Sequence, residues 1–300
     1  MRLFILLAAT LFFVSCSRQK EAEPSGIEAT SFSGTPLYSK VAEPAALAKS
    51  DSVITIFKSK SELTEDDYLE IGKQLVATYR YKLAVANFSD GLAKYPTSFK
   101  LLRNRGHRYI TLRQLDNAIV DLTKAEELIR SQPEVWEYDA QGKPNASYQH
   151  QIWYHIGLYY YLMKDYGQSA IAFEKSLAWT HEGRNIVGAT NWLYDAYQRS
   201  DQKQKAENIL KPITADYDTD REHAYFRRIM LYKGIITPEE LVNVNKPSDS
   251  LSVLDITKMY GLANWYAYRG DKEKATTLYH KILESKEWAG FAYAASEKEL

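Results

Sequence analysis

The sequence predicts an all-α fold in which helical hairpins stack side by side into a solenoid. The first observation is a repeat with a period of 34 residues, because Gly72 and Gly106 stand in register, as do Ala84 and Ala118. The second is the spacing of apolar residues within each copy, which follows the period of amphipathic helices. One hairpin leaves an apolar face bare, so each copy must bury that face against the next.

Five copies of this pattern follow one another along the chain. They lie near 65–96, 99–132, 150–182, 187–219 and 252–285, and an irregular helical pair at 220–247 precedes the last copy. Within that pair, Thr237, Pro238 and Glu240 predict a helix start, because they supply an N-cap, a first-turn proline and a capping-box glutamate. The repeat domain spans 62–300, and residues 286–298 predict a final helix that caps its exposed end.

The third copy carries Trp153, Gly157 and Tyr160 on its first helix and Phe173 on its second. This arrangement resembles the tetratricopeptide repeat, whose pattern is W-x2-L-G-x2-Y, then A-x3-F-x2-A, then Pro. The resemblance implies a right-handed superhelical solenoid with a concave groove lined by the first helix of each hairpin. It also implies a scaffold that binds a protein or peptide and carries no reaction centre.

The first sixteen residues, MRLFILLAATLFFVSC, are typical of a secretion leader. Arg2 supplies a positive charge, and Leu3 to Val14 form an apolar run too short to span a bilayer. The run ends at Ser15 and Cys16 and so resembles the lipobox of bacterial lipoproteins. That resemblance implies a signal peptide at 1–15 and acylation of Cys16. An ordinary leader, or an apolar segment with a chance cysteine, is the alternative.

The lipobox predicts a lipid-anchored protein of the bacterial cell envelope. Ser17, rather than Asp, follows the cysteine and favours the outer membrane, with its periplasmic or surface face left open. Residues 16–52 are rich in Ser, Ala, Glu and Pro. A segment of that composition buries too little apolar surface to offset its ordering entropy. We therefore expect a flexible tether between Cys16 and the repeats.

Composition and motif content favour no catalytic function. The 38 basic and 38 acidic residues balance, so bulk charge does not indicate nucleic-acid binding. Cys16 is the single cysteine, which excludes a disulfide or a cysteine-based zinc site. His150 and His155 are five residues apart and do not share a helical face as a metal-binding pair would. The sequence predicts neither an enzyme, nor a cofactor, nor a metal site.

The resemblance also implies which side chains face the groove. Lys100, Arg103 and His107 share one helical face and would suit a carboxylate, such as a peptide C-terminus or an acidic side chain. The two-carboxylate clamp of the family is not reproduced. Unselected surface residues are the alternative interpretation. The positions carried over by register are Lys73, Lys100, Arg103, His107, Tyr154, Tyr161, Asn191, Asp195, Gln198, Tyr260 and Asn264.

Three aromatic residues are not explained by repeat packing. Trp136 and Tyr138 lie in an insertion between the second and third copies, and Trp179 lies in the turn after the third. Such rings can stack on a sugar or anchor a partner, and they can equally fold down as lids. Two hypotheses follow: a membrane-anchored scaffold for a protein or peptide, and a glycan-binding lipoprotein acting with an outer-membrane transporter.

Overall fold

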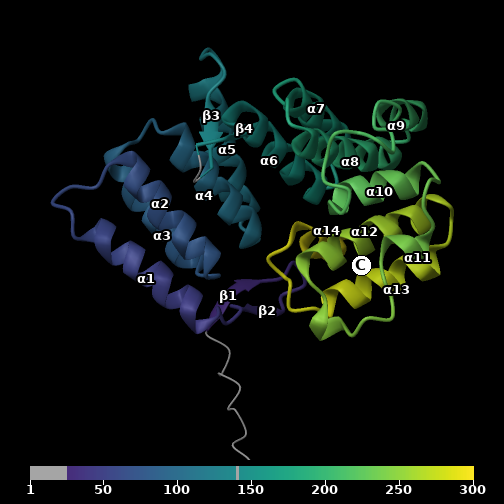
Figure 1. Cartoon of the computed structure of the whole chain (residues 1–300), viewed down its shortest axis with the longest axis horizontal. Coiled ribbons are helices and arrows are strands. Elements are labelled where there is room, and N and C mark those ends of the chain that lie inside the picture. Colours follow the sequence, from purple (N-terminus) through teal and green to yellow (C-terminus); the bar gives the residue numbers. More distant parts are fainter. Residues whose placement is uncertain (1–25, 140–141) are drawn as a thin grey trace, which may run out of the picture.

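A computed structural model describes residues 26–139 and 142–300, and within them the chain is mainly helical (Figure 1). The hairpins are formed by α2 (Glu65–Ala77) with α3 (Tyr81–Lys94), α4 (Phe99–Thr111) with α5 (Leu115–Ile129), α6 (Tyr148–Leu162) with α7 (Tyr166–Leu177), α8 (Gly183–Arg199) with α9 (Lys203–Leu210), and α12 (Val253–Tyr268) with α13 (Lys272–Leu283). These are the five predicted copies, so the prediction of a helical solenoid is confirmed.

Shorter elements complete the fold. The irregular pair consists of α10 (Ala224–Tyr232) and α11 (Pro238–Leu241), and α11 begins at the capping box predicted for Thr237 and Glu240. The end of the chain forms α14 (Phe291–Glu299), and the insertion forms an antiparallel hairpin of β3 (Trp136–Tyr138) and β4 (Pro144–Ser147). A 3-10 turn lies at Ser248–Ser250. In the described part of the chain, no helix combines the length and apolarity needed to cross a membrane.

The turn inside each repeat hairpin has one recurring geometry. The second residue after the first helix takes a left-handed conformation, with φ of 61° at Tyr79 and 65° at Arg113. The next amide then donates back to a carbonyl five residues earlier, as in Arg80 N to Leu75 O at 2.9 Å and Gln114 N to Tyr109 O at 2.8 Å. This pattern satisfies carbonyls that the helix end would leave without a partner. The same bond recurs from Asp165 to Tyr160, from Gln202 to Tyr197 and from Asp271 to Tyr266.

Small residues let the two helices of a hairpin approach closely. A Cβ atom on Gly72 would lie 2.1 Å from Cε1 of Phe88, a ring that is almost completely buried between the helices. A Cβ atom on Gly106 would lie 2.9 Å from Cγ of Leu122, and a Cβ atom on Gly157 would lie 2.9 Å from the ring of Phe173. The periodic glycines of the sequence are therefore explained by packing against the large residue of the second helix.

The structure corrects the expected tether. Residue 16 and residues 17–25 lie outside the described part of the chain, but the segment from residue 26 is built into the domain. β1 (Ile27–Thr30) pairs antiparallel with β2 (Pro36–Tyr38), and α1 (Pro44–Lys58) packs on α2. Ser50 donates its hydroxyl to the carbonyl of Gln74 at 3.0 Å, and Ile54 is buried. These tertiary contacts, which composition does not reveal, stabilise the segment.

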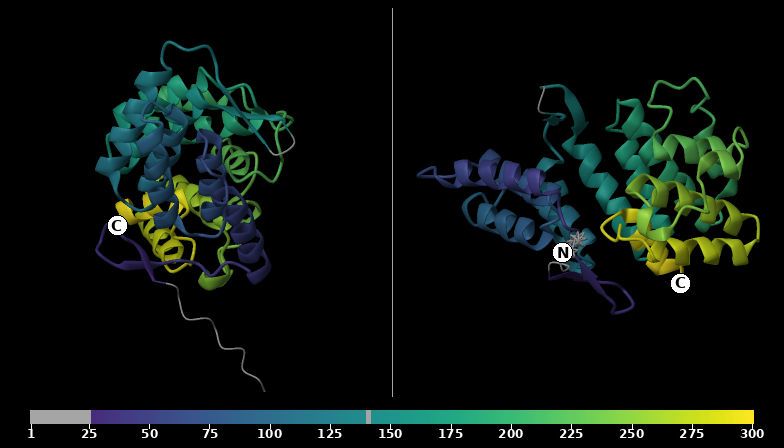
Figure 2. Two further views of the ribbon diagram at one scale, coloured as in Figure 1. Left: turned by 90° about the vertical axis from the view of Figure 1, so that its left-hand side faces the viewer. Right: turned by 60° about the horizontal axis from the view of Figure 1, so that its bottom comes forward.

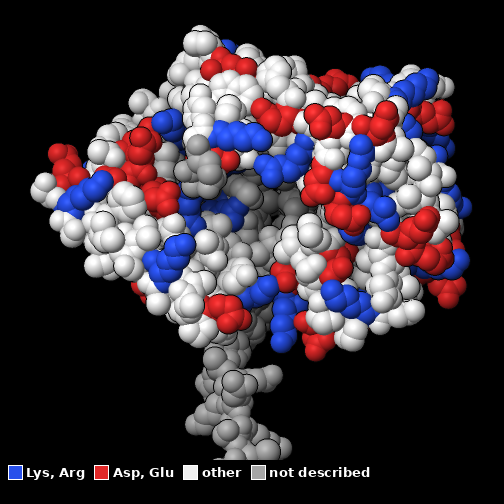
Figure 3. All heavy atoms as spheres, viewed as in Figure 1, with Lys and Arg blue, Asp and Glu red and all other residues white. Residues whose placement is uncertain are grey.

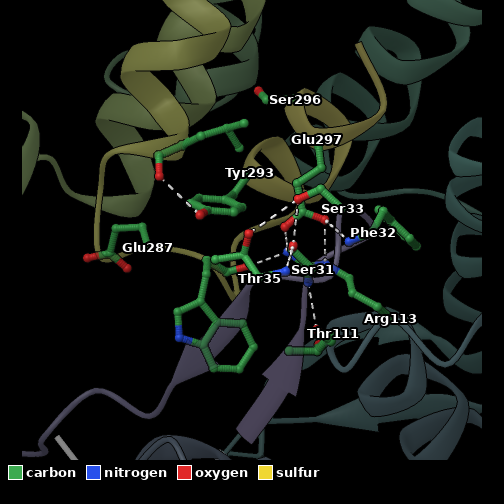
Figure 4. Close-up of polar contacts among 12 residues, drawn as sticks. Ser31, Phe32, Ser33, Thr35, Thr111, Arg113, Glu287, Tyr293, Ser296 and Glu297 are labelled. Carbon is green, nitrogen blue, oxygen red and sulfur yellow. Dashed lines mark hydrogen bonds and ion pairs between the residues drawn. The ribbon is translucent and has the colours of Figure 1, made fainter. Parts of the chain in front are cut away.

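The β1–β2 hairpin also joins the two ends of the repeat array, between the early hairpins on the left of Figure 1 and the last ones on the right. Arg113, in the turn between α4 and α5, pairs with Glu297 of α14 at 3.0 Å and 3.1 Å. The two side chains are each only 4% exposed. The amide of Phe32 donates to the same carboxylate at 3.3 Å, and Figure 4 shows these groups converging.

Two further contacts hold the β1–β2 hairpin against the C-terminal segment. We call this joining of the two ends of the array the closure. Nε1 of Trp288 donates to the carbonyl of Tyr38 at 2.5 Å, and Nζ of Lys40 lies 2.6 Å from Glu287. The final helix was expected to cap the end of the solenoid. It does contact α12 and α13, but it also contacts α6 of the third copy. The array is thus curled back on itself, as the two views of Figure 2 show.

We expect Gly72→Ala to lower the free energy of unfolding by about 1–3 kcal/mol, because the added methyl group overpacks against Phe88. Gly167→Ala is the matched control, since its nearest neighbour, Oδ1 of Asp165, would lie 3.7 Å from the new Cβ. The control should be neutral or stabilising by up to about 1 kcal/mol. Urea unfolding followed by circular dichroism measures both, and equal effects would contradict the packing role of Gly72.

We expect Glu297→Gln to cost about 3–5 kcal/mol, because it leaves the buried guanidinium of Arg113 without a charged partner. Glu127→Gln, in the exposed pair with Lys124 at 3.3 Å, should cost less than about 1 kcal/mol. Hydrogen exchange should show faster exchange of the β1–β2 amides in the first variant only. Unchanged exchange in that hairpin would argue against the closure.

Candidate functional site

The concave face divides into a sealed part and an open part. Of the six predicted groove residues from Tyr161 onward, five are buried in the protein core: Tyr161, Asn191, Asp195, Tyr260 and Asn264. The prediction that they face an open groove is wrong. It assumed that each first helix presents its inner face to solvent, whereas α10, α12 and α14 cover the inner faces of α6 and α8.

Asp195 binds a buried arginine. Its Oδ2 lies 2.5 Å from Nη2 of Arg228, and neither side chain is exposed. The hydroxyls of Tyr232 and Tyr268 donate to Oδ1 of Asp195 at 3.2 and 2.9 Å. Burial alone would lower the pKa of Arg228, but Tyr232 and Asp195 raise it above its ordinary value, so the guanidinium stays charged. This cluster holds α8, α10 and α12 together.

A second arginine uses most of the other predicted groove residues. Arg199 donates to the hydroxyl of Tyr161 at 2.8 Å and to Oδ1 of Asn264 at 3.0 Å, and it pairs with Glu299 at 2.7 Å. The hydroxyls of Tyr161 and Tyr260 are hydrogen-bonded at 2.9 Å. These residues therefore attach α14 to the inner helices and are not available to a ligand.

Gln198 is half-buried but belongs to a different surface. It lines a cavity of about 660 Å³ together with Lys203, Glu207 and Arg269, on the side of α8 that meets α9. Asn191 is fully buried, and its Nδ2 lies 3.4 Å from the carbonyl of Tyr225. Neither residue is placed beside the basic residues of the second copy.

The open part of the concave face keeps three of the predicted residues together. Arg103 and His107 from α4 and Tyr154 from α6 line one cavity of about 320 Å³. In Figure 3 a hollow opens between the two halves of the molecule, with Lys and Arg side chains along its upper border. The remaining lining residues are Asn145, Ala146, His150, Gln151, His155, Arg184, Asn185, Gly188, His223 and Tyr225.

The two predicted lysines flank this cavity without lining it. Nζ of Lys73 lies 3.4 Å from Glu137 of β3, and Nζ of Lys100 lies 3.2 Å from Glu65 at the start of α2. Glu137 also accepts a hydrogen bond from Gln151 at 3.0 Å. Although burial opposes it, the nearby charges of Arg103 and Lys73 hold the pKa of Glu137 below its usual range.

Four of the six histidines of the chain meet in this cavity: His107, His150, His155 and His223. The rings of His107 and His155 lie 4.1 Å apart between centroids. Sequence reasoning placed only His107 in the groove. It missed the other three because they come from two segments far from α4 in the sequence, although His150 and His155 flank the predicted groove residue Tyr154 on α6. In the described residues, no group of acidic, histidine or cysteine side chains is arranged to hold a metal ion.

The imidazoles are neutral at pH 7. Burial, together with nearby arginines, lowers the pKa of His107 and His155 far below the ordinary value. Burial also lowers the pKa of His150 to about 4, although its Nδ1 is hydrogen-bonded to Thr180 at 2.5 Å and lies 3.2 Å from the carbonyl of Ser176. The pKa of His223 is lowered by burial and by Arg184.

The cavity continues toward the last helix. An adjoining space of about 190 Å³ shares His107, Tyr154, His155 and Tyr225 with it and ends against Phe291 and other residues of α14. The cap helix therefore forms the floor of the open part of the groove. The position of that floor depends on the contact of α14 with Arg113.

The β3–β4 hairpin contributes Asn145 and Ala146 to the lining of the cavity, whereas its aromatic residues lie outside that lining. The ring of Trp136 lies 5.7 Å from that of His181, and both Trp136 and Trp179 are half-buried. Ser147 donates its hydroxyl to the carbonyl of Trp179 at 2.8 Å. Tyr138 is 55% exposed. Two of the three insertion and turn aromatics are thus partly packed on the solenoid edge, and Tyr138 is directed to the surface.

No known protein family and no curated protein matches the sequence. Three of the solved structures with a similar fold have low sequence identity to this chain. MamA from AMB-1 is 14% identical over 56% of this chain and 85% of its own, with a TM-score of 0.40. A tetratricopeptide repeat protein from Parabacteroides merdae ATCC 43184 is 13% identical over 85% of this chain and 93% of its own, with a TM-score of 0.48. Naa15/Naa10 bound to HypK-THB is 19% identical over 79% of this chain and 33% of that one, with a TM-score of 0.33.

Proposed function

We propose that this protein is a lipid-anchored scaffold of the bacterial cell envelope that binds a polypeptide segment in the open part of its concave face. The observation that carries the proposal is the cavity that joins Arg103, His107 and Tyr154, three of the residues predicted for the groove. Arginine and tyrosine are the residue types most often found at the centre of binding sites. The fold supplies a long concave surface for such a ligand.

The open part of the groove is suited to binding without large rearrangement. Its floor is fixed by α14, and its wall on α6 is held by hydrogen bonds such as Nδ1 of His155 to the carbonyl of Gln151 at 2.6 Å. A surface that is ordered before binding loses less conformational freedom when the ligand arrives. The half-buried ring of Tyr154 gives such a ligand a rigid apolar contact with little entropic cost.

The anchor in this proposal is Cys16, the residue that the lipobox resemblance predicts to be acylated. Cys16 lies outside the described residues, so the support for the anchor is the sequence of the leader alone. An N-terminal acyl anchor of this kind would keep the groove at the outer membrane, where its partner would be found.

We expect a photoreactive benzoylphenylalanine at position 154 to crosslink to a defined polypeptide when the protein is irradiated in its own membranes. The same group at position 171 is the matched control, because Ile171 is exposed on α7, an outer helix. Arg103→Glu, combined with the reactive group at 154, should abolish the product. A product of equal yield from both positions, or one insensitive to Arg103→Glu, would contradict binding in the groove.

We expect Cys16→Ser to move the protein from the membrane fraction to the soluble fraction without changing its melting temperature. The acyl chains would supply most of the membrane affinity. Fractionation followed by circular dichroism of the released protein measures both quantities. A variant that stays in the membrane fraction would refute the lipid anchor while leaving the groove proposal untouched.

A further inference from the structure

The cavity of the open groove is lined by basic side chains and by no acidic ones. Of the thirteen residues that line it, two are arginines, four are histidines and none is acidic. The adjoining space adds Arg113 and again has no carboxylate among its lining residues. The whole chain has equal numbers of acidic and basic residues, so a surface without any carboxylate departs from its average.

Two nitrogen atoms at this cavity are buried without a partner. In the described part of the chain, Nε of Arg103 and Nδ1 of His223 are inaccessible to solvent and make no hydrogen bond. Nη1 of Arg103 donates to Oδ1 of Asn104 at 3.0 Å. A buried polar nitrogen left unpaired costs about 1–3 kcal/mol, so such groups are expected where a ligand supplies the missing partner. Nε of Arg103 is always a donor, and Nδ1 of His223 is one whenever its imidazole is protonated.

The side chains around these two nitrogens are positioned by the protein itself. Nη2 of Arg184 donates to Oδ1 of Asn145 at 2.8 Å, and Nδ2 of Asn185 donates to the carbonyl of Asn145 at the same distance. Two carboxylates border the cavity without lining it: Glu137 is engaged by Lys73 and Gln151, and Glu182 accepts a hydrogen bond from Nδ2 of Asn185 at 3.2 Å. The positive charge of the cavity is therefore only partly compensated.

We propose that this cavity binds an oxyanion group, a carboxylate or a phosphate, through Arg103, Arg184 and the imidazoles of His150 and His223. Guanidinium groups form strong, charge-assisted hydrogen bonds with both kinds of group. The inference rests on the proposed function for the source of the anion, which is the end or an acidic side chain of the bound polypeptide. A free small anion is the other source with the same chemistry.

Binding should tighten as the pH falls. The four imidazoles are neutral at pH 7 because burial and neighbouring cations lower their pKa values. An anion among them favours the protonated form and raises those pKa values, so binding takes up protons. The charged groups that act on the four imidazoles are Arg103 and Arg108 from α4, Glu182 and Arg184 at the start of α8, and Asp220 before α10. The rings of Tyr154 and Tyr225 contact those of His155 and His223, and Glu137 borders the cavity from β3.

The first test is calorimetric titration of the full-length protein in detergent with sodium sulfate, which stays a dianion between pH 7.5 and 5.5. At constant ionic strength, we expect the affinity to increase at least tenfold between pH 7.5 and 5.5. Arg103→Gln and His223→Gln should each weaken binding about tenfold or more. Arg130→Gln and His181→Gln are matched controls on exposed side chains outside the cavity and should leave the affinity unchanged.

A second pair of variants at Gly188 tests the location without removing a charge. A Cβ on Gly188 would lie 3.6 Å from the ring of Tyr225, an ordinary contact, so Gly188→Ala should fold and still bind sulfate. Gly188→Leu extends a side chain into the cavity and should abolish binding. If Arg103→Gln fails to fold, the comparison of Gly188→Ala with Gly188→Leu still tests where sulfate binds.

The source of the anion is tested with a short peptide that has a free carboxyl terminus and with the same peptide as its C-terminal amide. Preference for the free carboxylate, lost in Gly188→Leu, assigns the anion to a polypeptide. Sulfate binding without such a preference assigns it to a free small anion and counts against the proposed function only. Absence of sulfate binding at both pH values, or equal binding in the two Gly188 variants, overturns the site, whereas crosslinking from position 154 would still support the scaffold.

Discussion

The buried ion pair between Arg113 and Glu297 is the central contact of the closed shape of this molecule, because it joins residues 184 positions apart in a fold whose helices pack mostly on their neighbours in sequence. A repeat array held only by contacts between successive units has two free ends. Here the turn of the second hairpin, the β1–β2 hairpin and the last helix share one carboxylate. The curvature of the array cannot flatten without breaking this pair, and separating the two partners is costly as long as either charge stays buried. The concave face is therefore fixed before any ligand arrives.

The closure also explains why the two parts of the concave face differ. Where α14 and α10 cover the inner helices, two arginines are buried with carboxylates: Arg228 with Asp195, and Arg199 with Glu299. Those charges are each paired with a carboxylate inside the protein, although Nε and Nη1 of Arg228 make no hydrogen bond. Where the curl leaves the inner helices uncovered, Arg103 keeps a nitrogen without a partner and is surrounded by neutral imidazoles. The same residue type thus serves the core in one part and remains available for recognition in the other.

The sequence predicted the structural features that depend on residues close together in the chain. It missed the features that depend on contacts between distant residues. The 34-residue period located the five hairpins, because Gly72 must fit against Phe88 within one hairpin. Thr237 and Glu240 located the start of α11, because a capping box joins residues only three positions apart. Tyr260 and Asn264 were predicted to line a groove from their positions in the repeat. Those positions do not indicate that the chain curls onto its own concave face and buries them. The strands β1 and β2 have four and three residues, and their contact with Glu297 has no local signal.

The corrected tether changes what a lipid at Cys16 would do. Only nine residues, 17–25, separate Cys16 from Gly26, where the described structure begins. That segment spans at most about 35 Å when fully extended. An acylated Cys16 would therefore hold the β1–β2 hairpin, and with it the Arg113–Glu297 pair, within that distance of the bilayer. A partner of the groove would have to meet the protein close to the membrane, which favours a polypeptide that is itself attached to the membrane over one that diffuses freely.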